Sequence, residues 1–216
     1  MKKTFALLKY LSKTDGNLIL QGFTFSLLYS FLWGFFVQAE ISHEMFFLVS
    51  WIGTLYTLLL ASSNLYQKDF QDGFLVLALS HNFKISNIFI AKLLFIFINF
   101  LVPSSASCFL MGVFLNVELS VILSFYAGLY ALSLGLISLI HVSSLFLAHT
   151  KTFPFLGSIL LIPFLIPIVI FGVSLSLKTL EGLTFTPLLL SCLGVNIIYS
   201  MTSWLLSKAL LRSKLS

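Results

Sequence analysis

Long apolar stretches alternate with short polar connections along the whole of this 216-residue chain. Each stretch has the length of about 20 residues that a helix needs to cross a hydrocarbon core of about 30 Å. The pattern therefore predicts six transmembrane helices, at residues 18–38, 45–66, 88–114, 119–147, 153–177 and 186–207. The connections leave no room for a separate soluble unit, so we expect one transmembrane domain over residues 1–216.

The segment 2–14 has a different period, which predicts an amphipathic helix. At 100° per residue its lysines fall on one side and its leucines on the other. These are Lys2, Lys9 and Lys13 against Leu7, Leu8 and Leu11. Such a helix lies in the headgroup layer with its lysines toward anionic lipid, so we expect an interfacial helix here.

The composition agrees with a membrane protein, because 59% of the residues are hydrophobic and only 9% are charged, against about 25% charged in soluble domains. The basic residues are strongly asymmetric, and basic loops mark the cytoplasmic side. Eleven of the 12 fall on one side of the predicted spans, namely Lys2, Lys3, Lys9, Lys13, Lys68, Lys84, Lys92, Lys151, Lys208, Arg212 and Lys214, and only Lys178 on the other. The asymmetry predicts that both termini and the loop 67–87 are cytoplasmic, or on the matrix side in an organelle.

The loop 67–87 is the longest polar interruption between the spans. Asp69 and Asp72 precede Gly73, and the residues 74–79 are nearly all apolar. An aspartate is a good N-cap, so we expect Asp72 to cap a short helix that begins at Gly73. That helix would expose Phe74, Leu75, Leu77 and Leu79, and exposed apolar groups on a loop indicate a partner groove or the headgroup layer.

Few chemically active groups occur within the spans. Lys92 lies near the cytoplasmic end of the third span, where we expect it to reach out to the interface, and no deep charge indicates an ion pathway. Small or polar residues recur at helical spacing and predict close helix packing. The four sets are Gly53, Thr57 and Ala61; Ser104, Cys108 and Gly112; Ala127, Ala131 and Gly135; and Cys192, Asn196 and Ser200. Prolines at 103, 163 and 167 predict kinks or local openings in the third and fifth spans.

The cysteines Cys108 and Cys192 lack the sequence spacing of metal ligands and are interpreted as packing residues.

An axial haem ligand is conceivable for any of the histidines, at positions 43, 81, 141 and 149. No second ligand or charge partner accompanies any of them, so we favour ordinary structural roles. On this basis we expect replacement of both His141 and His149 to leave function largely intact.

Two stretches resemble one known family. They are LLLASSNLYQKDFQDGFLVLALS, followed by Ala91-Lys92, and FPFLGSILLIPFLIPIVIFG at residues 153–172. Both are similar to the CcmB family, the haem exporter membrane proteins of cytochrome c maturation. The chain also resembles that family in length, number of spans and position of the loop. It departs from the family pattern at Val76, where an acidic residue is usual, and at Asn82, where proline is usual, which puts in doubt a specific salt bridge to a partner.

The resemblance implies an all-α integral membrane protein of the type 2 ABC exporter kind, with a cytoplasmic coupling helix between spans 2 and 3. Its partners would be an ABC ATPase (CcmA-like), CcmC-like and CcmD-like membrane subunits, the CcmE-like haem chaperone and a second copy of the chain. The ATPase-binding residues it implies are Asp69, Phe70, Gln71, Asp72, Gly73, Phe74, Leu75, Leu77 and Leu79. It implies no catalytic, metal or resident cofactor site, and haem is expected only as cargo of the complex.

Two alternatives stay open. One is a permease of the same architecture for another cargo, such as a lipid or a drug. The other is an intramembrane enzyme, for which we consider Ser158 with His141 or His149 as a nucleophile–base pair, although no recognisable motif or oxyanion element accompanies it. The sequence lacks the phosphate-binding motif G-x-x-x-x-G-K-[ST], so ATP hydrolysis is expected in a separate subunit. We expect the bacterial inner membrane, with the mitochondrial inner membrane as the alternative, and no nucleic-acid partner.

Overall fold

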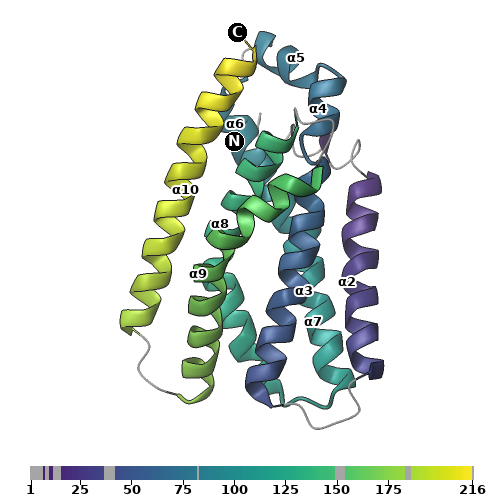
Figure 1. Ribbon diagram of the computed structural model, residues 1–216, viewed down its shortest axis with the longest axis vertical. Coiled ribbons are helices and arrows are strands. Elements are labelled where there is room, and N and C mark those ends of the chain that lie inside the picture. The colour runs from purple at the N-terminus through teal and green to yellow at the C-terminus, as the bar shows by residue number, and fades with distance from the viewer. Residues whose placement is uncertain are drawn as a thin grey trace.

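The computed structural model describes residues 7, 10–11, 16–36, 42–81, 83–148, 154–182 and 186–215. Every regular element within these ranges is a helix (Figure 1). In chain order the elements are α2 (Gly16–Phe36), α3 (His43–Asn64), α4 (Gln67–Gln71), α5 (Phe74–Ser80), α6 (Ile85–Ile96), the π-helical turn η1 (Phe97–Leu101), α7 (Val102–Phe114), α8 (Leu119–Leu147), α9 (Pro154–Leu180) and α10 (Thr186–Leu215).

The long helices occupy the six stretches that the sequence predicts. Four of them, within the described residues, are long and apolar enough to cross a membrane. These are Ile85–Phe114, Leu119–Leu147, Leu161–Leu180 and Pro187–Leu211. A shorter apolar segment, Phe23–Trp33, lies within α2. An all-helical membrane protein is therefore confirmed, whereas a crossing by α2 and α3 stays a prediction.

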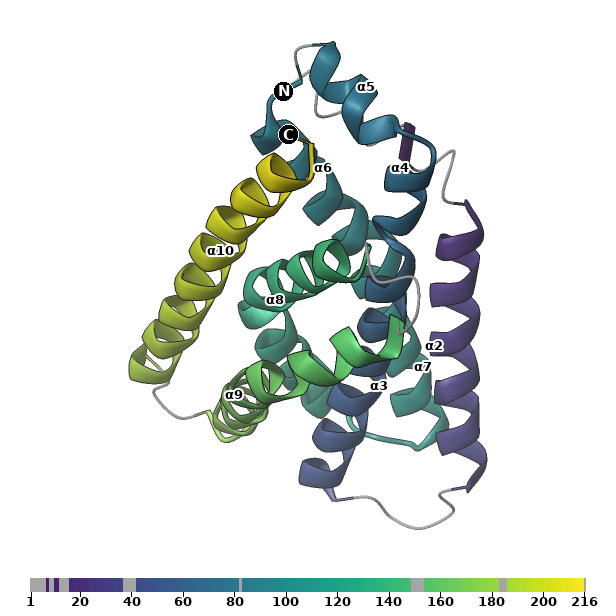
Figure 2. The ribbon, with the colours of Figure 1, turned by 45° about the horizontal axis from the view of Figure 1, so that its top comes forward.

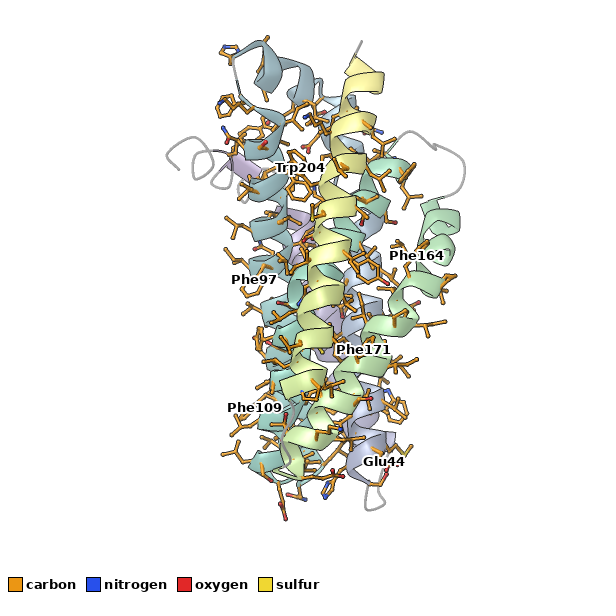
Figure 3. All side chains as sticks on the ribbon, turned by 90° about the vertical axis from the view of Figure 1, so that its left-hand side faces the viewer. Glu44, Phe97, Phe109, Phe164, Phe171 and Trp204 are labelled. Atoms are coloured by element: carbon orange, nitrogen blue, oxygen red, sulfur yellow. The ribbon has the colours of Figure 1, made fainter. Side chains whose placement is uncertain are left out.

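The two ends of the bundle carry different charges. The short helices α4 and α5 lie together at one end, which α10 also reaches at its C-terminal side (Figures 1 and 2). Lys84, which directly precedes α6, Lys92 of α6 and Lys208 of α10 lie toward this end. Glu44 lies at the opposite end (Figure 3). The basic residues that the sequence groups on one side thus lie at one end where the structure describes them, and the side of the membrane that this end faces stays a prediction.

The third predicted span is opened by a π turn before Pro103. Proline has no N–H, so the carbonyl of Asn99 loses its usual helical partner. The backbone accommodates this in η1, where the N–H of Val102 donates to the carbonyl of Phe97, five residues earlier.

In α9 both Pro163 and Pro167 lie inside a continuous helix, whose axis changes direction along its length (Figure 1). The predicted local opening and bend are thus both present.

Glycines of α8 and α9 allow close contacts among α3, α8 and α9. A Cβ atom added at Gly172 of α9 would overlap the Trp51 ring of α3, and one added at Gly128 of α8 would lie 2.5 Å from the Gly172 carbonyl oxygen. In lipid, helices associate through such van der Waals packing of small residues. The predicted small-residue sets do the same where the structure describes them, since Gly53 abuts Tyr29 and Gly112 abuts Ile122.

We expect Gly172→Ala to destabilise the bundle by about 1–3 kcal/mol, because the added methyl group overpacks the contact with Trp51. Gly194→Ala is the matched control, since a Cβ atom there meets nothing within 4 Å and alanine favours a helix over glycine. Thermal unfolding of both purified proteins in the same detergent measures the difference. Equal melting temperatures would show that α3 and α9 are not held by this contact.

Candidate coupling site

The segment between α3 and α6 folds as two short helices rather than the single one that the sequence predicts. Gly73 separates them with φ +66°, a backbone conformation that glycine adopts without strain. The Gly73 carbonyl then accepts from the N–H of Leu77 at 3.1 Å, so Gly73 ends the turn and α5 begins at Phe74. The additional helix α4, of five residues, carries Asp69 and Phe70.

The apolar residues of α5 do not all face outward. Leu75 is 1% exposed and Ala78 is also buried, whereas Leu77 is 60% exposed. Residues three apart share one face of a helix, so Leu75 and Ala78 seat α5 on the protein and Leu77 points away. The expectation that Leu75 is exposed was wrong, and an aspartate there would disturb folding rather than test docking.

The other predicted partner-binding residues fall into distinct environments. Gln71 and Asp72 are exposed, Phe70 and Phe74 are half-buried, and Asp69 is buried. The side chain of Leu79 lies outside the described residues. The outward surface is therefore formed by the α4–α5 turn and by Leu77.

The described part of the N-terminal segment packs against α5. The rings of Tyr10 and Phe74 are stacked with centroids 4.5 Å apart, and Leu7 and Leu11 are buried in the apolar core. These two leucines pack on the protein, whereas the lysines of the predicted interfacial helix lie outside the described residues. An open groove of about 270 Å³ lies between the segment and α5. Its lining residues are Leu7, Tyr10, Phe74, Leu77, Ala78, His81 and Phe83.

A buried ion pair fastens α4 to the bundle. The Lys92 Nζ atom lies 2.7 Å from Asp69 Oδ2, and the two side chains are 1% and 6% exposed. Lys92 also donates to the carbonyl of Leu65 at 2.8 Å, just after α3 ends. The ammonium group further lies 5.1 Å from the centre of the Tyr66 ring, a cation–π geometry. Lys92 therefore does not extend to the interface as expected, because Asp69 meets its charge inside the protein.

Next to the ion pair, His141 of α8 links two further elements. Its Nε2 atom is hydrogen-bonded to the Tyr66 hydroxyl at 2.6 Å, and its Nδ1 atom to the Ser207 hydroxyl of α10 at 3.3 Å. All three residues are buried, and the Phe89 ring packs edge-on against the imidazole. These contacts support a structural role for His141, and they add two hydrogen-bond partners that the sequence did not indicate. His149 lies outside the described residues.

The contact between α8 and α10 is polar along its length. The Asn196 side chain accepts from the Gly135 N–H at 2.7 Å and donates to the Ala131 carbonyl, two backbone groups four residues apart in α8. Ser203 donates to the Ser138 carbonyl at 2.7 Å. With His141–Ser207 these bonds form a row, which we call the α8–α10 seam. Asn196, from the set predicted on the last span, thus contacts Ala131 and Gly135, from the set predicted on the fourth span.

A family comparison supplies the functional context. The family model described as CcmB protein matches residues 8–211, nearly the whole chain. The chain belongs to the CcmB family. The family comprises the membrane subunits of a haem exporter in c-type cytochrome biogenesis. No curated protein matches the chain.

The CcmB-family chain offers little support for the enzyme alternative. Both imidazole nitrogens of His141 are engaged by Tyr66 and Ser207, and the Ser158 side chain lies outside the described residues. Within the described ranges no three His, Cys, Asp or Glu side chains are grouped as a metal site would require. His43 and His81 are exposed. The ordered polar groups instead connect helices.

Asp69→Asn and Lys92→Met should each destabilise the protein by about 3–5 kcal/mol, because each leaves the other charge buried without its partner. The double variant should recover much of this loss, since it leaves no unpaired charge. Thermal unfolding of the four proteins in detergent gives the double-mutant cycle. Strictly additive losses would contradict a direct interaction between the two side chains.

Proposed function

We propose that this CcmB-family chain is the permease subunit of an ABC-type complex and that α4 and α5 form its docking element for a separate ATPase. The observation that carries the proposal is the mounting of α4–α5. A buried ion pair fixes α4 to α6, Leu75 seats α5 on the core, and Leu77 stands out at 60% exposure. A docking element needs to be fixed to the protein on one side and to expose an apolar side chain, here Leu77, on the other.

The wider arrangement in the membrane belongs to the same proposal. All six long helices cross the bilayer, and both termini and α4–α5 face the cytoplasm, in agreement with the eleven-to-one division of basic residues. Two copies of the chain pair with two ATPase subunits and with CcmC-like and CcmD-like membrane subunits. The complex delivers haem, its cargo, to a CcmE-like chaperone from the bacterial inner membrane.

Leu77→Asp should reduce co-purification of the ATPase about tenfold or more, because burying an exposed leucine contributes about 1.5–3 kcal/mol and the aspartate adds a desolvation cost. Ser80→Asp is the matched control. It introduces the same charge on the same helix, at a position that is already polar and exposed. The membrane complex is purified through a tag on this chain, at matched membrane levels, and the ATPase is quantified.

Equal ATPase retention by Leu77→Asp and the parent would rule out α5 as the principal docking element. Equal loss in Leu77→Asp and Ser80→Asp would show that surface charge, rather than an apolar contact, governs association. Because the ATPase is cytoplasmic, a selective loss in Leu77→Asp also places α5 on the cytoplasmic side.

Lys84→Ala, at an exposed charge near the groove, should have a small effect, since exposed ion pairs contribute about 0–1 kcal/mol.

Gly73→Ala and Gly182→Ala separate backbone strain from docking. Both glycines have φ +66° and a Cβ atom added at either meets nothing within 4 Å, so alanine should introduce a similar strain of about 1–2 kcal/mol at each. Gly182 follows α9 at the opposite end of the bundle (Figure 1). Thermal unfolding should show similar losses, whereas only Gly73→Ala should lower ATPase co-purification. A similar reduction of co-purification by both variants would contradict a specific role for the α4–α5 turn.

A further inference from the structure

The ion pair explains how α4 is held, but not how its movement would reach the distant helices of the bundle. α4 packs against α3, α5 and α8, whereas α10 packs against α8, α9 and α6. α8 therefore packs against both the docking element and the last helix, and α6, which the ion pair joins to α4, also packs against α10. The group on α8 that contacts both sides by hydrogen bonds is His141.

Tyr66 is the residue through which α4 reaches His141. It directly precedes α4, and its carbonyl accepts from the N–H of Phe70 at 3.1 Å, so the backbone of Tyr66 forms part of the first turn of α4. Its neighbour Leu65 is held by Lys92. Any displacement of α4 must move the backbone of Tyr66, and the Tyr66 hydroxyl is bonded to His141 at 2.6 Å.

The imidazole of His141 passes this contact to α10. A neutral imidazole has one donor and one acceptor nitrogen, and hydroxyl groups can take either role. Tyr66 and Ser207 therefore satisfy both nitrogens at once. All three residues are buried, where a hydrogen bond is stronger than in water and a broken one leaves an uncompensated polar group.

We propose that Tyr66, His141 and Ser207 are positioning residues that form a relay, by which a displacement of the α4–α5 docking element moves α8 and α10 together. The inference rests on the proposed function and adds the route by which the ATPase acts on the membrane helices. The relay has no part in ATPase docking itself, because its three side chains are enclosed by the bundle. Its loss therefore uncouples ATP hydrolysis from haem delivery, so this proposal replaces the expectation from the sequence that removal of His141 leaves function largely intact.

The test compares Tyr66→Phe and Ser207→Ala in the whole complex, reconstituted in lipid. Each change removes one hydroxyl of the relay and little volume. Ser203→Ala is the matched control for Ser207→Ala, because Ser203 also donates one buried hydroxyl bond from α10 to α8, to the Ser138 carbonyl. Tyr29→Phe is the control for Tyr66→Phe, since the Tyr29 hydroxyl donates to the Val49 carbonyl at 2.7 Å, between α2 and α3.

Three quantities are measured for each variant: the ATPase retained on purification, the rate of ATP hydrolysis, and the rate of haem transfer to the chaperone. We expect Tyr66→Phe and Ser207→Ala to retain the ATPase and to hydrolyse ATP at close to the parent rate. Haem transfer should fall about tenfold, a factor of the order that an unpaired buried polar group produces. The two controls should keep the parent ratio of haem transferred to ATP hydrolysed.

A double variant tests whether the two hydroxyls act through the same group rather than by separate losses of stability. If both act through His141, Tyr66→Phe/Ser207→Ala should transfer haem at a rate within about twofold of the slower single variant. A parent ratio of transfer to hydrolysis in both single variants would overturn the relay, as would an equal fall in the controls. Absence of an ATPase from the parent complex would instead overturn the proposed function.

Discussion

The constraint on which this structure depends is the cost of placing a charge inside a membrane protein. An ammonium group taken out of water is strongly destabilising unless a carboxylate and further acceptors surround it. Lys92 meets this requirement with Asp69 and the Leu65 carbonyl. Because these partners come from α4 and from the end of α3, while Lys92 itself belongs to α6, the one charge fixes how these three elements are placed. The path of the chain between the second and third long helices follows from that requirement.

The same physics organises the contact between α8 and α10. In lipid no hydrophobic force drives two apolar helices together, so packing and interhelical hydrogen bonds must supply the specificity. Asn196 is hydrogen-bonded to two backbone groups of α8, at Ala131 and Gly135, and a Cβ atom at Gly135 would lie 2.9 Å from the Asn196 Oδ1 atom. Ser203 and Ser207 continue the row toward the end that carries α4. These contacts set the register of α10 along α8, since a slide by one turn would unpair every group.

The sequence predicts the positions of the long helices well, because an apolar run of about 20 residues has few alternatives to a membrane helix. It also predicts the opening before Pro103 and the packing at small residues. The first follows locally from the absence of an N–H in proline, and the second from the small side chains. It did not predict that Lys92 is buried or that His141 has partners. Those roles depend on Asp69, Tyr66 and Ser207, which lie 23, 75 and 66 residues away from the group each one meets. The spacing of Leu75 and Ala78, three residues apart, was a signal that one face of α5 is covered.

The mounting of α5 also decides what a partner can do to the bundle. A helix of seven residues is far below the length of about 12–15 residues at which an isolated helix becomes stable in water. α5 therefore exists as a helix only while Leu75 and Ala78 are buried and Phe74 is stacked on Tyr10. A partner that binds Leu77 cannot displace α5 alone without unfolding it. Unfolding would remove the surface to which the partner binds. The displacement must then pass to the elements beneath, first to α4 and its ion pair. If α5 docks the ATPase as proposed, its short length therefore couples any displacement of α5 to the elements on which it is packed.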